Sequence, residues 1–457
     1  MTRAAPGRYE VKTSADGFEP FASKEEVIAG EVSTVTYRPR AVVAADPSGA
    51  QEIRVVGERP AREVTRRAIE QREITRIPGT NGDALRAVEN MPGVARSPGL
   101  GGMLIVRGSA PQDTGVFVDG TQIPIAFHFG GVSSVVPSHV LERIDFLPGN
   151  FGPEYGRAMG GNIDIGLRSP AKDKVHGMAQ VDLLDARFVF EAPLSTKTRM
   201  MVAGRRSHVD AWIGGVLEAG GAVGVRTAPV YYDYQAMLEH DVTSSTTARL
   251  AIFGSDDALK LTLNSTGADP AEAGDLGVAT VAYANSGSGR IFGGELLLRY
   301  KPDARFFGWI AYTLSRSERR ADDTEQLRTF DYDQTHILTA LGSYKLGRGW
   351  EVGGRWRYVT GNPHTPVASS IYDADAGAYA PVNGAPFSGR TAAFHRLDVR
   401  VDKTWTFKDW KLSAYLDVQN AYFRANPEGE SHNYNYSKSA VTTGLPFLPV
   451  IGLRGEL

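Results

Sequence analysis

The chain has 457 residues, enough for two or three domains, and its formal net charge of -2 gives no basic field that would indicate nucleic acid as a partner. It contains no cysteine, which excludes disulfides and thiolate metal sites. The 51 glycines and 25 prolines, beside a hydrophobic fraction of only 42%, are typical of a turn-rich, polar β protein.

The first 45 residues predict a small β unit. Residues 9–12 and 32–37 alternate in polarity, and Asp16-Gly17 is one of the turn signals beside them. The unit resembles the last strands of an immunoglobulin-like carrier domain of the carboxypeptidase-regulatory type, which implies that its first strands are missing. Residues 46–57 form a linker. No apolar signal-peptide core follows Met1, so we expect a removed signal, a different start or a fragment.

Residues 58–172 predict a mixed α/β domain. Residues 80–83 can cap a helix at 84–89, which Pro92-Gly93 would end. Strands are expected at 104–108 and 115–120, each ending in a glycine turn, then a short helix at 138–142 and a strand at 144–146.

From residue 173 to 457 the polarity pattern changes to a period of two. Stretches of about ten residues alternate, which is the length that a tilted strand needs to cross a bilayer. No run of about 18 apolar residues is present, so a closed barrel is the remaining way to span a membrane. The clearest stretch puts Trp410, Leu412, Ala414, Leu416 and Val418 on one face and Asp409, Lys411, Ser413, Tyr415, Asp417 and Gln419 on the other.

A soluble β-sandwich would also alternate, so the connections decide between the two folds. Those at 302–304 and 345–349 are tight, whereas those at 317–330 and 361–391 are long. Short turns on one side and long loops on the other are typical of outer-membrane barrels, and charges in mid-strand suit a wet lumen. We therefore expect a mainly β chain with a transmembrane antiparallel β-barrel.

A dense series of motifs lies in the α/β domain. In order and spacing these motifs resemble the plug of TonB-dependent outer-membrane receptors over about 100 residues. The motifs are Ile77-Pro78-Gly79-Thr80, Gly82-Asp83-Ala84-Leu85, Asn90-Met91-Pro92-Gly93-Val94, Val106-Arg107-Gly108, Val118-Asp119-Gly120, Ile144 with Pro148-Gly149, and Tyr155-Gly156 with Gly160-Gly161.

The resemblance implies a gated 22-stranded barrel that holds the plug and imports a scarce solute, such as an iron-siderophore complex, cobalamin or a glycan. It implies a monomer in the outer membrane of a Gram-negative cell. Its partners would be outer-membrane lipid, the solute and a TonB-type energy-transducing protein. It implies no cofactor and no enzyme activity, and no phosphate loop, zinc helix or nucleophile elbow occurs. Asp373 to Gly377 could bind calcium, but no downstream acid completes the loop.

The resemblance also assigns candidate site residues. In the plug, glycines are expected to provide turns at positive φ or close packing, although each alone could be an ordinary hairpin turn. Arg107, Arg157 and Glu154 are candidate partners for charges on the barrel wall. The candidate plug residues are Arg107, Gly108, Asp119, Gly120, Gly149, Tyr155, Gly156 and Arg157.

Two further segments have a functional and a plain interpretation. Glu52, Ile53, Arg54, Val55 and Val56 resemble a TonB box, a strand that adds to a sheet edge of its partner, or are a linker strand. An apolar loop with Phe127, His128 and Phe129 is either an apex that contacts substrate or packing against the barrel wall.

The barrel region is short for this family. We count about fourteen candidate strands, and the residues after 172 allow only about 13 residues per strand for 22 strands. The expected junction is near 264–284, where eight to ten strands would be missing. The sequence leaves three functions open, namely an active importer, a binding or signalling receptor, and a shortened relative that does not transport. Leu457 also departs from the aromatic C-terminus usual in outer-membrane proteins.

Overall fold

The chain divides into two compact units, Met1–Pro60 and Ala61–Leu457. The computed structural model describes residues 7–14, 21–27, 66–97, 102–128, 131, 133–156, 158–211, 230–258, 287–300, 305–320, 324–444 and 447–457. In the first unit it describes an antiparallel hairpin of β1 (Gly7–Thr13) and β2 (Phe21–Val27). The strand expected at 9–12 lies in β1, β2 was not predicted, and residues 32–37 lie outside the described residues.

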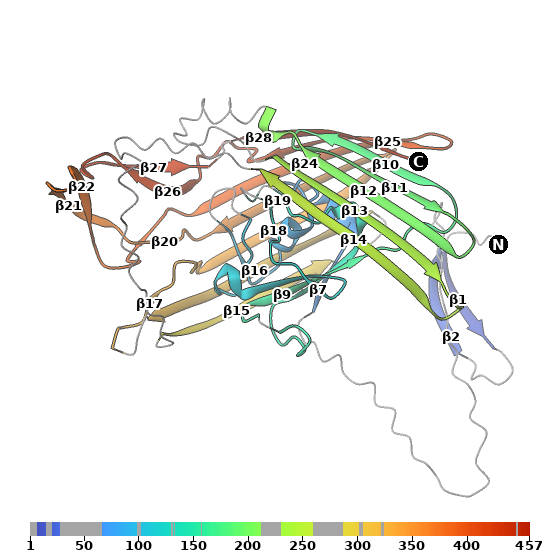
Figure 1. Cartoon of the computed structure of the whole chain (residues 1–457), viewed down its shortest axis with the longest axis horizontal. Helices are drawn as coiled ribbons and strands as arrows, with labels where there is room; N and C mark the ends of the chain where they lie inside the picture. Colours follow the sequence, from blue (N-terminus) through green and yellow to red (C-terminus); the bar gives the residue numbers. More distant parts are fainter. Residues whose placement is uncertain are drawn as a thin grey trace, which may run out of the picture. The chain divides into compact units, whose positions relative to one another are not determined.

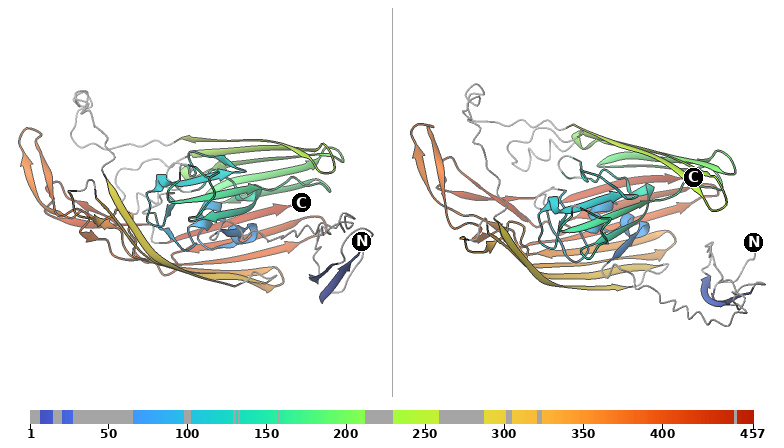
Figure 2. Two further views of the ribbon diagram at one scale, coloured as in Figure 1. Left: turned by 90° about the horizontal axis from the view of Figure 1, so that it is seen from below. Right: turned by 60° about the horizontal axis from the view of Figure 1, so that its bottom comes forward.

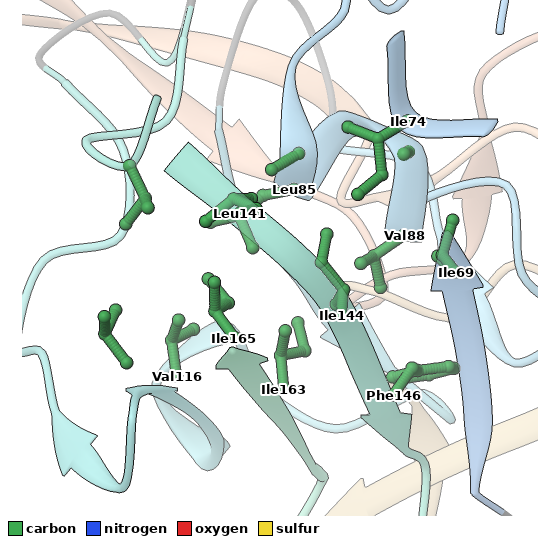
Figure 3. Close-up of a cluster of buried hydrophobic side chains, with 14 of the residues drawn as sticks. Ile69, Ile74, Leu85, Val88, Val116, Leu141, Ile144, Phe146, Ile163 and Ile165 are labelled. Carbon is green, nitrogen blue, oxygen red and sulfur yellow. The ribbon is translucent and has the colours of Figure 1, made fainter. Parts of the chain in front are cut away.

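The plug, within the second unit, is built on a five-stranded sheet in the order β3-β8-β9-β6-β7, with β6 parallel to β9. Two short helices pack on this sheet through a buried apolar cluster that includes Ile74, Leu85 and Ile144 (Figure 3). The elements are β3 (Arg67–Glu70), α1 (Gln71–Arg76), α2 (Ala84–Val88), β4 (Val94–Ala95), β5 (Ile105–Val106), η1 (Pro111–Asp113), β6 (Thr114–Val118), β7 (Thr121–Gln122), η2 (Ser138–Val140), β8 (Leu141–Leu147) and β9 (Gly161–Leu167).

The plug helices follow their local capping signals. The Asp83 carboxylate accepts hydrogen bonds from the amides of Leu85 and Arg86, both at 3.1 Å, and so begins α2 where the sequence predicted a helix. The helix expected at 138–142 is only the 3₁₀ turn η2, since β8 begins at Leu141. Helix α1 was not predicted.

The remaining long strands form one curved antiparallel sheet, and the plug lies on the concave face of this sheet (Figures 1 and 2). Its order is β14-β13-β12-β11-β10-β28-β25-β24-β19-β18-β16-β15, and β17 (Arg328–Thr329) pairs with β16. The strands are β10 (His176–Asp182), β11 (Asp185–Pro193), β12 (Thr198–Ser207), β13 (Val230–Asp241), β14 (Thr247–Ala258), β15 (Ser288–Tyr300), β16 (Phe306–Arg320), β18 (His336–Gly347), β19 (Trp350–Val359), β24 (Phe394–Thr406), β25 (Lys411–Gln419) and β28 (Leu448–Glu456).

The two faces of this sheet differ as the alternation predicted. In β25, Asp417 faces the plug and is fully buried, whereas Leu416 faces away and is 41% exposed. In β28, Ile451 is 65% exposed on the same outer face. An apolar outer face and a polar inner face suit a sheet whose outer surface meets hydrocarbon. Among the described residues, no helix is long and apolar enough to cross a bilayer.

The connections also differ between the two ends of the sheet. At one end they are short, as at 194–197, 242–246 and 407–410, and at the other most are long, as at 360–393 and 420–447. The long connections carry their own small hairpins, which extend beyond the sheet (Figure 1). These hairpins pair β20 (Pro363–His364) with β23 (Gly389–Arg390), β21 (Val367–Asp373) with β22 (Ala378–Asn383), and β26 (Pro427–His432) with β27 (Ser439–Thr443).

The described sheet ends at β14 and β15, which flank residues 259–286, outside the described part of the chain. Every neighbouring pair along the sheet is antiparallel, so β14 and β15 run in opposite directions. Any strands that join them must therefore be even in number. The expected junction near 264–284 and the missing strands stay a prediction.

Candidate functional site at the plug–sheet interface

The inner face of the sheet carries buried charges of both signs. Asp398 is 1% exposed, Arg355 4% and Arg400 5%. Buried charges are costly unless they are paired and hydrogen-bonded, so each requires partners on the sheet or on the plug. The contacts between these charges and the plug define the candidate functional site.

The plug main chain at Gly79 is held by two strands of the sheet. Its amide donates to both carboxylate oxygens of Asp417 at 3.0 Å, and its carbonyl accepts from Arg355 Nη2 at 3.1 Å. Arg355 also binds the Asp398 carboxylate at 2.6 Å and Asn90 Oδ1 at 3.1 Å. Gly79 has φ of +70°, and a Cβ there would collide with Arg355 Nη2 and Asp398 Oδ2. Glycine avoids both the strained backbone and this collision.

A second contact joins the plug to the end strand β15. Glu295 accepts hydrogen bonds from Arg67 at 2.7 Å and from Arg107 through Nε at 2.7 Å and Nη2 at 3.1 Å. On the same strand Arg299 Nη2 donates to both carboxylate oxygens of Glu73 at 2.6 Å. Charge-assisted, two-point pairs of this kind fix orientation as well as distance.

The opposite end strand, β14, is also tied to the plug. The Asp119 carboxylate accepts from Arg249 Nη1 at 2.9 Å and from the amide of Leu167 at 3.0 Å. Asp119 and Gly120 both have positive φ, of 45° and 80°, as do Arg107 and Gly108. The two motif turns thus direct Arg107 toward one end strand, β15, and Asp119 toward the other, β14.

The other plug-motif residues have different surroundings. A Cβ at Gly149 would meet Arg107 Nη1 at 2.7 Å, which indicates close packing, whereas one at Gly156 would meet nothing within 4 Å. The Tyr155 hydroxyl donates to Asp164 Oδ2 at 3.0 Å, within the plug. Arg157 lies outside the described residues.

The apolar plug loop lies against the sheet. Phe127 is 8% exposed and His128 2%, and Phe129 lies outside the described residues. The His128 ring is stacked on Tyr231 at 4.0 Å between centroids, and its nitrogens lie 2.9 Å from Asp257 Oδ1 and 3.2 Å from Asp233. These surroundings match packing against the barrel wall, and contact with substrate would require this loop to move.

A chamber of about 630 Å³ opens between the plug and the short-turn end of the sheet. Its lining includes Arg76 on α1, His139 on η2, Arg168 after β9 and Arg454 on β28. Burial first, and then the nearby guanidinium groups, lower the pKa of His139 well below its usual value. Above that pKa the ring is neutral, and its Nε2 lies 3.1 Å from Gln180 Oε1.

The described residues give no support to two of the sequence hypotheses, the TonB box and the calcium loop. The TonB-box candidate at residues 52–56 lies outside them. Asp373 Oδ1 accepts from the amides of Asp375 and Ala376 in the turn between β21 and β22, which is an ordinary role for aspartate in a turn. Within the described residues, no group of three or more His, Asp or Glu side chains could hold a metal ion.

Sequence reasoning missed the residues on the sheet side of the interface, namely Glu295, Arg355, Asp398 and Asp417. The alternation puts Asp417 on the polar face of its strand, but nothing in the sequence pairs it with the plug. Gly79 was noted only as part of a motif. A glycine next to proline in a plug loop was the available signal, because such a position often allows close backbone contact.

Residues 60–162 match the family model described as TonB-dependent Receptor Plug Domain. Among solved structures, a chain of the FpvAI–pyocin S2 complex is 10% identical with a TM-score of 0.50, over 86% of this chain and 84% of that chain. The ferripyoverdine receptor of the Pseudomonas aeruginosa outer membrane is 9% identical with a TM-score of 0.48, over 86% of each chain. No curated protein sequence matches the chain.

A mutant of the Pseudomonas aeruginosa ferric enterobactin receptor, PfeA, is 17% identical with a TM-score of 0.33. That match covers 78% of this chain and only 57% of that receptor. The chain thus combines a plug domain with a curved antiparallel sheet whose outer face is apolar. Residues 60–162 of the chain therefore form a plug domain of the TonB-dependent receptor type.

Proposed function

We propose that the chain is an outer-membrane receptor that imports a scarce solute through release of its plug. The observation that carries the proposal is the polar attachment of the plug, at Gly79 and at both end strands of the sheet. Water can replace such polar contacts one at a time, whereas the apolar side chains that the sheet adds to the plug cluster, such as Phe307 and Trp309, must separate together. A plug attached in this way can be released and can return.

Coupling to a TonB-type protein is assigned to residues 52–56. An extended segment of this kind would add as a strand to an edge of the partner, so its backbone donors matter more than its side chains. Val55→Pro removes one donor and should abolish energised uptake while leaving binding of the solute intact. Val55→Ala keeps the donor and is the matched control.

The assay is uptake of a radiolabelled panel of ferric siderophores, cobalamin and oligosaccharides by cells that lack their own receptors. Loss of uptake in Val55→Pro, with uptake kept in Val55→Ala, supports the assignment. Equal uptake by the two variants would reject this segment as the coupling site. Recovery of the wild-type chain from the soluble fraction without detergent would reject the membrane location.

A shortened relative that does not transport is the second candidate. It is favoured by one observation, namely that β14 and β15 do not pair with each other in the described sheet. The same uptake assay separates the candidates. Binding with energised uptake indicates an importer, binding alone indicates a receptor, and neither indicates a shortened relative.

A further inference from the structure

The outer face of the sheet has a groove of about 760 Å³ across β10, β11, β12 and β28. Its floor is made of small outward-facing residues, Ala179, Ala186 and Gly455. Ala179 lies opposite both Phe188 and Gly455 in the strand register, so three neighbouring strands contribute at one level. Nothing lies within 4 Å of a Cβ built at Gly455, which shows that this part of the floor is open.

Large apolar side chains form the walls of the groove. Phe188 is 49% exposed on one side, and its ring leans over Gly204, away from Ala179. Leu453 is 50% exposed on the other side, opposite Val181 in the register. Most of the polar lining residues turn their side chains inward, so the groove is apolar between its walls. These inward residues are Gln180, Arg187, Arg205, Asp233 and Arg454.

One charged side chain stands at the long-connection end of the groove. Arg206 is the second-last residue of β12 and faces outward, opposite Ala186. Its Nε donates to the Tyr232 hydroxyl at 3.1 Å, and its guanidinium lies 5.5 Å from the centre of the Tyr232 ring. Among the described residues it makes no ion pair with a carboxylate, although Asp210 is close enough to act on it electrostatically. Asp256 lies beyond Tyr232 in the next strand.

An arginine on a lipid-facing surface is destabilising unless it lies near the membrane interface or meets an anion. Here the apolar groove leads directly to a guanidinium that Tyr232 holds in place. A molecule that fits both parts is apolar over most of its length and anionic at one end. Guanidinium groups bind phosphate through two parallel hydrogen bonds, so a phosphate group is the matching end.

We propose that this groove binds one phosphate-bearing membrane lipid, with an acyl chain over Ala179 and Ala186 and the phosphate at Arg206. The lipid would lie in the leaflet on the side of the long connections. The inference rests on the proposed membrane location and is independent of transport.

The test is native mass spectrometry of the detergent-purified full chain titrated with dioleoyl phosphatidic acid, with dioleoylglycerol as the uncharged probe. The wild-type chain should retain one phosphatidic acid. Arg206→Gln, which removes the charge, and Ala179→Leu, which fills the floor, should each reduce the bound fraction about tenfold. Arg290→Gln is the matched control, because Arg290 is also an outward arginine near a strand end but pairs with Glu318 at 2.7 Å.

Equal retention of dioleoylglycerol and phosphatidic acid would overturn the phosphate assignment. Equal loss in Arg206→Gln and Arg290→Gln would show attraction to surface charge in general and overturn the site. Displacement of bound lipid by inorganic phosphate alone would show an anion site without a groove. A dimer that Ala179→Leu dissociates would assign this face to a second copy of the chain. Because none of these readouts depends on uptake, they can fail or succeed separately from the proposed transport.

Discussion

Gly79 attaches the plug to the sheet through its main chain, since its amide and its carbonyl bind Asp417 and Arg355. A main-chain contact resists most substitutions, but it demands a residue without a side chain at positive φ. Both charged partners are buried and hydrogen-bonded to this main chain, so the geometry of one glycine helps to satisfy two charges. The interface is therefore most sensitive at a position that carries no functional group.

Gly79→Ala should weaken the attachment of the plug. The left-handed backbone alone costs about 1–2 kcal/mol for a residue with a Cβ, and the collision with Arg355 and Asp398 adds to it. Gly120→Ala is the matched control, because Gly120 also has positive φ but has nothing within 4 Å of its Cβ. Urea unfolding in detergent should show a larger loss of stability for Gly79→Ala. Equal losses would contradict a role for the collision.

Glu295→Gln should loosen the plug at its β15 contact. The substitution leaves Arg67 and Arg107 without their carboxylate, a loss on the order of 1–3 kcal/mol. Amide hydrogen exchange in β3 and β5 should then become about tenfold faster or more. Glu318→Gln removes a carboxylate that pairs with Arg290 and Arg316 on the sheet itself, and exchange in the plug should not change. Faster exchange in both variants would indicate a general loss of stability.

At the scale of elements, α1 and η2 position Arg76 and His139 in the lining of the chamber at the short-turn end of the sheet. Helix α1 has only six residues, and its capping box between Glu70 and Glu73 defines where it begins. Glu73 also binds Arg299 on β15, so the same carboxyl group caps the helix and ties it to the sheet. A change in the charge of this chamber should therefore affect how the plug is seated.

Low pH should weaken the attachment of the plug through protonation of His139. Its pKa is depressed in the folded chain, so the unfolded state binds more protons, and stability falls as pH decreases below the ordinary histidine value of 6.5 toward the folded pKa. His139→Asn should lose less stability than the wild type between pH 7.5 and 5.5 in urea unfolding. His176→Asn is the control, since His176 lines the same chamber but pairs with Asp173 near the surface. An unchanged pH dependence in His139→Asn would contradict the assignment.

The sequence predicted these elements unevenly, for physical reasons. The long strand at 411–419 lies close to its predicted position because its two faces, one exposed and one packed on the plug, impose alternation on every residue. Helix α1 was not predicted because six residues carry little periodicity, and the helix depends on a cap and on Ile74 in the core. The ion pairs of Glu295 were not predicted because its partners, Arg67 and Arg107, lie 228 and 188 positions away in the chain.

At the scale of the whole molecule, the plug is in contact with both end strands of the described sheet. Arg107 reaches β15 and Asp119 reaches β14 from turns only twelve residues apart in the chain. The plug thus links the two strands that flank residues 259–286. This arrangement gives the plug a structural role in the sheet besides the gating role proposed for it.

If no further strands cover β14 and β15, their outward backbone amides should exchange quickly with solvent. Hydrogen exchange measured by mass spectrometry in detergent would compare peptides of β14 and β15 with those of β13 and β16, which are paired on both sides. Slow exchange in the end strands would show that other strands pair with them, and would contradict the expected deletion.

The pairing of β10 with β28 has a consequence for biogenesis. In the described sheet, strands β10 to β14 are linked to strands β15 to β25 only by β28, which follows all of them in the chain. Until β28 inserts between β10 and β25, the chain holds two separate half-sheets, each with exposed edges. Folding should therefore be post-translational, with insertion of β28 as the step that joins the halves. An antibody or peptide that captures residues 448–456 before insertion would arrest the chain in that divided state.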